Sequence, residues 1–253
     1  MENAVKHIHI ENLLGKYTLD WSPNPDVNIL VGINGSGKST LLRKIDAYFN
    51  NKIEDGEIQI DPNIKEKLRC LLINTFDVSV RDKKQLRTKE SPLDLILREL
   101  LFATGKKSIE RSFVNYRLRA TDSSENKLIN NKIDALKELI NQLFSKTNKR
   151  IWIKSNEIVF ETSDQEVIQL EQLSSGEKQL LIILFTVFLT EEQPFFLLVD
   201  EPEISLHIEW QEKLIDVIRE LNPNCQLIIA THSPSIFGDG WGDKIFFMED
   251  LMV

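Results

Sequence analysis

A glycine-rich stretch with one lysine, GINGSGKST at residues 32–40, has the composition of a phosphate-binding loop. It follows the apolar run VNILV and precedes TLLRKIDAYF, which has helical spacing, and this is the context that G-x-x-x-x-G-K-[ST] requires. Glycines let backbone N–H groups turn toward phosphates, and the helix N-terminus adds positive partial charge. We expect Lys38 to reach the terminal phosphates of ATP and the Ser39 hydroxyl to bind Mg²⁺. The residues predicted to hold the nucleotide are Asn34, Gly35, Ser36, Gly37, Lys38, Ser39 and Thr40.

Two acidic residues end another apolar run, PFFLLVDEPE at 194–203. Because this run reads as a buried strand, Asp200 and Glu201 should project from the sheet edge where the phosphate-binding loop is also expected. A carboxylate there can hold Mg²⁺, so Asp200 and Ser39 form the predicted metal site. Glu201 is placed to orient and deprotonate a water molecule. A chance lysine in a glycine-rich turn, or acids that merely cap a helix, are the alternatives, and the apolar strands argue against them.

Histidines occur in two different settings. His232 ends the apolar run QLIIATHS, which should place it at the same sheet edge, and with Lys38 and Glu201 it completes the candidate catalytic residues. His7 and His9 share one face of the predicted strand VKHIHI. They are a conceivable metal pair, but no third ligand lies nearby in the sequence, which favours a structural role.

A second stretch, LSSGEKQ at 173–179, also resembles a phosphate-gripping turn. Ser174, Ser175 and Gly176 are predicted to open a helix, where hydroxyls and free N–H groups form an anion site. The chain already holds a complete phosphate-binding loop, so the second element calls for a different explanation.

The motifs GINGSGKST, LSSGEKQ, LLVDEPE, ISLH and THSP, in this order, resemble the ATPase heads of the ABC superfamily. They are most similar to the SMC/RecF/OLD-type branch of soluble ATPases. In that family, two copies pack head to tail, and the second motif, called the signature, covers the nucleotide held by the other copy. The resemblance therefore implies a homodimer that closes around ATP and opens after hydrolysis.

The resemblance also assigns roles to individual residues. Ser174 and Gly176 are expected to contact the γ-phosphate of the partner's nucleotide, and His232 is expected to be the switch histidine that contacts the γ-phosphate. The loop after the acids is expected to cross the dimer seam, and its residues are Ser205, Leu206 and His207.

Two features of the family pattern are not evident in this sequence. The glutamine that usually lies between the phosphate loop and the signature is absent from LINTFDVSV, where Asn74 or Asp77 could substitute. For the aromatic side chain that stacks on adenine, Tyr17 and Trp21 are candidates, although either could equally belong to the core.

Apolar strands alternate with helices along the chain, and each strand ends in polar residues. This pattern predicts an α/β fold with a mainly parallel P-loop NTPase sheet, an N-terminal antiparallel β portion and an inserted helical lobe. An amphipathic stripe runs from Leu128 to Leu143, and RIWIKSNEIVFE at 150–161 reads as a hairpin that turns at residues 155–156.

Residues 1–253 are therefore predicted to form a single ABC-type ATPase domain. Its nucleotide-binding core is expected at about residues 1–85 and 171–253. The inserted lobe, with its helices, hairpin and approach to the signature, is expected at about residues 86–170.

Composition places the chain among ordinary globular proteins, with 42% hydrophobic and 28% charged residues. Two cysteines without a CxxC pattern indicate neither a disulfide framework nor a zinc site, and no secretory leader is evident, so a cytoplasmic location is expected. The longest apolar run, at 180–189, is too short to span a membrane and reads as a buried helix.

Charge is unevenly distributed. The chain carries a net charge of −8, which argues against a general nucleic-acid coat, yet between residues 81 and 120 basic residues outnumber acidic ones by 11 to 5. This segment is either a solvated helical face or a docking patch for nucleic acid or an acidic partner.

The segment between the phosphate loop and the signature is too short to hold a long coiled coil. The chain is therefore expected to be a free-standing head that controls a separately encoded effector, a nuclease or toxin, as the ATPase subunits of bacterial anti-phage systems do. A nucleotide-binding subunit of a transporter and an ATP-binding scaffold with negligible turnover are the alternatives.

Overall fold

The computed structural model describes residues 4–52, 57–74, 91–102, 112–122, 126–154, 157–238 and 240–252. Two compact units make up the chain, the first from residues 1–77 and 190–253 and the second from residues 78–189. Much of the basic segment, including Lys83, Lys84 and Arg87, lies outside the described residues, as does Asp77.

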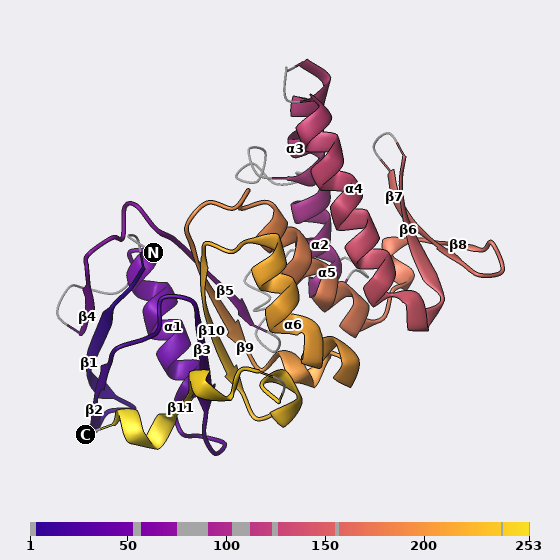
Figure 1. The fold of residues 1–253 in the computed structure, drawn as a ribbon. Helices are drawn as coiled ribbons and strands as arrows, with labels where there is room; N and C mark the ends of the chain where they lie inside the picture. The colour runs from indigo at the N-terminus through magenta and orange to yellow at the C-terminus, as the bar shows by residue number, and fades with distance from the viewer. Residues whose placement is uncertain are drawn as a thin grey trace. The chain divides into compact units, whose positions relative to one another are not determined.

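A five-stranded parallel sheet is the centre of the first unit (Figure 1). Its strand order is β11-β3-β10-β9-β5, so the strand before the phosphate loop is separated from the strand before the acids by the strand that leads to His232. Residues of β9 and β10 are buried along their whole length, as expected for central strands of a parallel sheet. The strands are β3 (Val27–Val31), β5 (Arg69–Asn74), β9 (Phe195–Asp200), β10 (Cys225–Thr231) and β11 (Ile245–Phe247).

An antiparallel sheet of order β2-β1-β4 forms the N-terminal β portion that the sequence predicts. It consists of β1 (His7–Leu13), β2 (Tyr17–Trp21) and β4 (Ile58–Asp61). Alternation along β1 buries Ile8 and Ile10, while His7 and His9 stay partly exposed. The buried side of this sheet shares one hydrophobic core with helix α1 (Lys38–Phe49) and with the parallel sheet.

Helices cover both faces of the parallel sheet, α1 on one and α6 (Ile208–Leu221) on the other (Figure 1). Helix α6 is amphipathic and buries Leu214, Ile215 and Ile218. Short 3-10 turns follow the strands of this unit, at Pro202–Ile204 after β9, Pro234–Ile236 after β10, and Gly242–Lys244 and Met248–Leu251 around β11. The predicted α/β architecture is thus confirmed.

The second unit contains the helical lobe, the hairpin and the signature helix. Its helices are α2 (Pro92–Phe102), α3 (Phe113–Asp122), α4 (Asn126–Leu143) and α5 (Ser175–Phe188), and its strands are β6 (Lys149–Lys154), β7 (Glu157–Thr162) and β8 (Val167–Ile168). Strands β6 and β7 pair antiparallel, which confirms the hairpin, and β8 adds to β7.

Aromatic contacts connect the helices of this unit. The Phe113 ring lies 5.0 Å from that of Phe185, and the Tyr116 ring lies 5.0 Å from that of Phe188. The apolar stripe of α4 is buried from Ile129 onward, but Leu128 is 56% exposed. Leu128 lies in the first turn of α4, before the stretch of this helix whose apolar side chains are buried. Among the described residues, no helix has the length and apolar character that crossing a bilayer demands.

Candidate functional site

The phosphate loop closes tightly on itself between β3 and α1. Gly35 and Gly37 have φ angles of 80° and 97°, a backbone conformation that favours glycine. A Cβ atom at Gly32 would lie 2.8 Å from Ser36 Oγ, so this position has no room for a side chain. Gly35 and Gly37 are therefore favoured by the backbone conformation and Gly32 by the lack of space, and the loop leads directly into the first turn of α1.

Lys38 folds back across the loop. Its Nζ donates to the carbonyl oxygens of Gly32 at 2.9 Å and Ile33 at 3.3 Å, and it lies 2.8 Å from His232 Nε2. An ammonium group can only donate, so Nε2 accepts and the proton of the neutral imidazole is assigned to Nδ1. Burial lowers the pKa of Lys38, an effect that the negative charges of Glu201, Asp200 and Glu203 oppose. All three ammonium hydrogens can thus be occupied by groups that a phosphate could replace.

Ser39 and Asp200 meet where α1 begins and β9 ends. Ser39 Oγ donates to Asp200 Oδ1 at 2.9 Å. Burial raises the pKa of Asp200, and the Glu201 charge raises it further, although the hydrogen bond from Ser39 opposes this. A bound cation would offset the cost of burying this carboxylate. A hydroxyl and a carboxylate are the hard oxygen ligands that Mg²⁺ takes alongside phosphate oxygens and water, so the pair fits the ion.

The described residues hold no group of three or more His, Cys, Asp or Glu side chains suited to a metal by itself. A cation at Ser39 and Asp200 would therefore need nucleotide oxygens or water to complete its coordination. That requirement matches the way Mg²⁺ is held in many nucleotide sites.

Glu201 lies immediately beyond β9 in an unusual backbone conformation. Its φ angle is 48°, in the left-handed region, which costs a non-glycine residue about 1–3 kcal/mol and is common at active sites. Its N–H donates to Ala230 O at 2.8 Å, which ties it to β10. Its Oε1 lies 3.5 Å from His232 Nε2, and its side chain is 24% exposed, so water can reach it.

The ends of three neighbouring strands thus bring the predicted residues of the first unit together. Asp200 is in register with Ala230 on one side and with Asn74 on the other. Asn74 therefore lies at the sheet edge beside the acids, where the resemblance places a glutamine. The positions where the apolar runs end in the sequence are sufficient to predict this edge, because parallel strands have their carboxyl ends at the same edge of a sheet.

Residues of the loop after the acids differ in their exposure. Leu206 is buried, whereas His207 and the flanking Ile204 and Ile208 are exposed. Ser205 Oγ is buried and has no hydrogen-bond partner among the described residues. Apolar side chains that are exposed beside a nucleotide site are available to contact another molecule.

The signature turn, residues 173–179, lies in the second unit at the start of α5. Ser174 is the N-cap: its Oγ accepts from Glu177 N at 3.2 Å, and Glu177 Oε2 accepts from Ser174 N at 2.8 Å. This capping box explains why the helix begins here. Ser174 and Ser175 are exposed, while Gly176 is buried. Both serines are therefore accessible to solvent, although the Ser174 hydroxyl is engaged in the cap.

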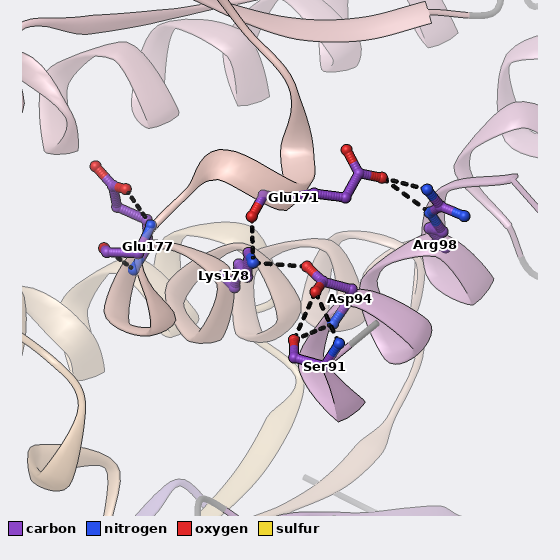
Figure 2. A network of polar contacts seen from close by, with 7 residues as sticks. Ser91, Asp94, Arg98, Glu171, Glu177 and Lys178 are labelled. Atoms are coloured by element: carbon purple, nitrogen blue, oxygen red, sulfur yellow. Dashed lines mark hydrogen bonds and ion pairs between the residues drawn. The ribbon is translucent and has the colours of Figure 1, made fainter. Parts of the chain in front are cut away.

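A network of charged side chains holds the signature helix within its unit (Figure 2). Lys178 Nζ lies 2.6 Å from Asp94 Oδ1 of α2 and donates to Glu171 O at 2.8 Å. Arg98, also on α2, forms an ion pair with the Glu171 carboxylate. Sequence reasoning missed this network; a lysine inside the first turn of a very apolar helix was the available signal.

Glu177 has a second, partly buried partner. Lys149 Nζ donates to both of its carboxylate oxygens, at 2.7 and 2.9 Å. Burial raises the pKa of Glu177, but the hydrogen bonds from Lys149 and Ser174 outweigh burial and hold that pKa below its ordinary value. For Asp94, burial is likewise outweighed by the hydrogen bonds from Lys178 and Ser91, and its pKa is lowered.

The candidate adenine-stacking residues and the two N-terminal histidines lie in or beside the antiparallel sheet. Trp21 is 2% exposed and packs edge-on against Phe246 at 5.3 Å between ring centroids, so it belongs to the core and cannot stack on adenine. Tyr17 is partly exposed. His7 Nε2 and His9 Nδ1 lie 3.4 and 3.0 Å from the same Asp20 oxygen, an ion-pair arrangement on the exposed side of the antiparallel sheet.

The sequence is similar to three proteins that have been named. The chain is 23% identical to the Septu protein PtuA of Bacillus thuringiensis, over 91% of this chain and 72% of that protein. It is 23% identical to the Retron Vc95 probable ATPase of Vibrio cholerae, over 57% of this chain and 34% of that protein. It is 25% identical to the uncharacterized ABC transporter ATP-binding protein YmeB of Lactococcus lactis, over 93% and 78%.

Solved structures share the fold. The SmcHead bound to the C-winged helix domain of ScpA aligns with a TM-score of 0.53 at 16% identity, over 93% of this chain and 91% of that one. The SMC head domain from Thermotoga maritima aligns with a TM-score of 0.52 at 17% identity, over 96% and 94%. At this level of identity the likeness shows the fold alone, which is that of an SMC-type ATPase head.

A family model described as "AAA domain, putative AbiEii toxin, Type IV TA system" matches residues 49–238, which is most of the chain. The chain therefore belongs to this family, and it is an ATPase with the fold of an ABC-superfamily head.

Proposed function

We propose that the protein hydrolyses Mg-ATP as a head-to-tail dimer and works as a switch for a separately encoded effector, a nuclease or toxin, in anti-phage defence. The observation that carries the proposal is the pairing of two elements in one chain. A phosphate loop with its acids and histidine lies in one unit, and an exposed, capped helix start at Ser174 and Ser175 lies in the other. Two copies would complete two sites at once.

Within the site, each side chain has a distinct task. Lys38 exchanges its carbonyl partners for the terminal phosphates. Ser39 and Asp200 hold Mg²⁺, which when bound supplies positive charge beside the phosphate oxygens. Glu201 orients the attacking water and accepts its proton, and His232 holds the other side of the reacting group.

Several observations support dimer closure and an effector. The exposed Ile204, His207 and Ile208 beside the acids offer a surface for a second copy. A head of this fold has been solved with a separate protein, ScpA, bound to it. The likeness to relatives named for the Septu and retron systems supports a role in defence.

The dimer is tested by trapping it. Glu201→Gln should bind ATP without hydrolysing it and accumulate as a dimer in ATP and Mg²⁺, measured by size-exclusion chromatography with light scattering. Adding Ser174→Arg should remove that dimer, because a long cation then occupies the start of α5. Ser163→Arg is the matched control on an exposed turn of the same unit and should leave the dimer intact. A dimer that survives Ser174→Arg refutes pairing through the signature.

The name of the Lactococcus lactis relative favours the transporter alternative. A transporter subunit should sediment with membranes from its native host, whereas the proposed switch should be recovered without them. Copurification of a membrane protein with the Glu201→Gln variant would support the transporter reading and count against the switch.

Nucleic-acid sensing through the basic segment is a separate proposal that rests on the sequence. Reversing the charges of Lys83, Lys84 and Arg87 should weaken binding to DNA or RNA, and wild-type binding should fall steeply with salt. Fluorescence anisotropy at low salt measures both. Absence of wild-type binding there would remove the idea.

A further inference from the structure

Two loops leave the catalytic edge of the sheet from neighbouring strands. The acid loop, residues 201–207, follows β9, and the histidine loop, residues 232–236, follows β10. Two side chains connect these loops, Glu203 and Gln211. Neither was among the residues to which the sequence assigned a role.

Glu203 holds the backbone of the switch histidine. Its Oε1 accepts from the N–H of His232 at 2.6 Å, a short bond to a charged acceptor. The imidazole of the same residue lies 2.8 Å from Lys38 Nζ and 3.5 Å from Glu201 Oε1. The second carboxylate oxygen of Glu203 is buried and has no hydrogen-bond partner among the described residues. The bond to His232 is therefore the contact that fixes this carboxylate.

The side chain of Gln211 forms hydrogen bonds to both loops. It lies in the first turn of α6 and is buried. Its Nε2 donates to Leu206 O at 2.7 Å and, more weakly, to Glu203 O at 3.4 Å. Its Oε1 accepts from Ser233 Oγ at 2.7 Å. One buried amide thus binds the acid loop with its donor and the residue after His232 with its acceptor.

We propose that Glu203 and Gln211 are positioning residues of the ATPase, which lock the switch histidine to the acid loop. A movement of the acid loop then moves His232 relative to Lys38, so hydrolysis depends on where that loop lies. Neither side chain touches the reacting atoms; both act through His232. The inference uses the ATPase activity and does not require the head-to-tail dimer.

Kinetics separate positioning from a merely structural role. Glu203→Ala should lower kcat for ATP by about 10- to 100-fold, the range for losing one charge-assisted hydrogen bond in the productive geometry. KM should change by less than about twofold, because the phosphate loop is untouched. Glu203→Gln should keep most of the activity, since its amide oxygen can accept from the same N–H. Glu212→Ala, which removes an exposed carboxylate of α6, is the matched control and should behave as wild type.

A double-mutant cycle tests whether the effect passes through the histidine. In a His232→Ala background, Glu203→Ala should reduce kcat little further, because the imidazole that Glu203 positions is already absent. Gln211→Met, which keeps length and volume but loses all three hydrogen bonds of the amide, should show the same loss of kcat and the same dependence on His232. If Glu203→Ala does not fold, the Gln211→Met variant provides the test.

All rates are taken at protein concentrations where turnover per chain is constant, with ATP affinity and the thermal midpoint measured in parallel. Weak dimerisation then cannot imitate a loss of kcat. Full activity of both Glu203→Ala and Gln211→Met overturns the proposal. So do losses that add fully to that of His232→Ala, and so does a Glu203→Gln variant as inactive as Glu203→Ala.

Discussion

Replacing Lys178 by methionine should destabilise the second unit substantially. The side chains of Lys178 and Asp94 are 8% and 9% exposed, and the charged atoms are 2.6 Å apart. Methionine fills a similar volume but leaves the Asp94 carboxylate buried without its cation. Removing one partner of a buried ion pair costs about 3–5 kcal/mol. Because Ser91 still donates to Asp94 through its N–H and hydroxyl, we expect a loss near the lower end, about 3 kcal/mol.

Urea unfolding followed by circular dichroism and tryptophan fluorescence measures this loss. Trp152 is the single tryptophan between residues 78 and 189 and reports on this unit. With m values of about 1–3 kcal/mol/M, the midpoint should fall by about 1–3 M. Lys137→Met, at an exposed ion pair in the same unit, is the control and should cost less than about 0.5 kcal/mol.

The same reasoning requires a specific rescue. Adding Asp94→Asn to Lys178→Met removes the unpaired charge but keeps an oxygen for Ser91, so stability should return to within about 1 kcal/mol of wild type. A double variant no more stable than Lys178→Met alone would refute the buried charge as the cause. A single variant as stable as wild type would show that the Asp94 carboxylate does not need its cation, which would also refute the reasoning.

Further predictions concern the phosphate loop and pH. Lys38→Met should abolish hydrolysis and weaken ATP binding by about tenfold or more, measured by calorimetry; wild-type affinity would contradict the assigned role. Gly32→Ala would place a Cβ 2.8 Å from Ser36 Oγ. It should raise the Kd for ATP clearly while lowering the thermal midpoint only slightly. The lowered pKa values of Glu177 and Asp94 contribute stability that is complete above their ordinary values of 4.5 and 3.8 and is lost as pH falls through the lowered values. Urea midpoints of the second unit, measured from about pH 7 to about pH 3, should fall accordingly, and unchanged midpoints would contradict these pairings.

Motifs at strand ends could be located from the sequence because their placement follows from local rules. An apolar run that stops at Asp200, and another that stops before His232, must end at the same edge if both strands are parallel. Gly35 and Gly37 of the phosphate loop are likewise favoured by the backbone conformation at single positions. Such information lies within a few residues of each motif.

Features that depend on distant partners could not be found in this way. Trp21 is buried because Phe246, far away in the sequence, packs against it. Lys178 is neutralised by Asp94, which belongs to another helix, and Gln211 is identified only by the two loops that it joins. A side chain in an amphipathic pattern shows which face it is on, but not what covers that face. The exposure of Leu128 could not be predicted either, because the consecutive residues Leu139 and Ile140 of the same helix are both buried and helical spacing alone does not distinguish Leu128 from Ile129.

The neighbours of β3 have a consequence for biosynthesis. This strand, which leads into the phosphate loop, pairs with β10 and β11, whose residues begin at Cys225. A nascent chain exposes the loop early, yet the strand has no partner to hold it in the sheet until some two hundred further residues have been translated. Contacts this remote in sequence form slowly and late. An emerging polypeptide should therefore acquire the capacity to capture nucleotide only near the end of synthesis, and ribosome-bound intermediates that stop before Cys225 should not be retained on immobilised ATP.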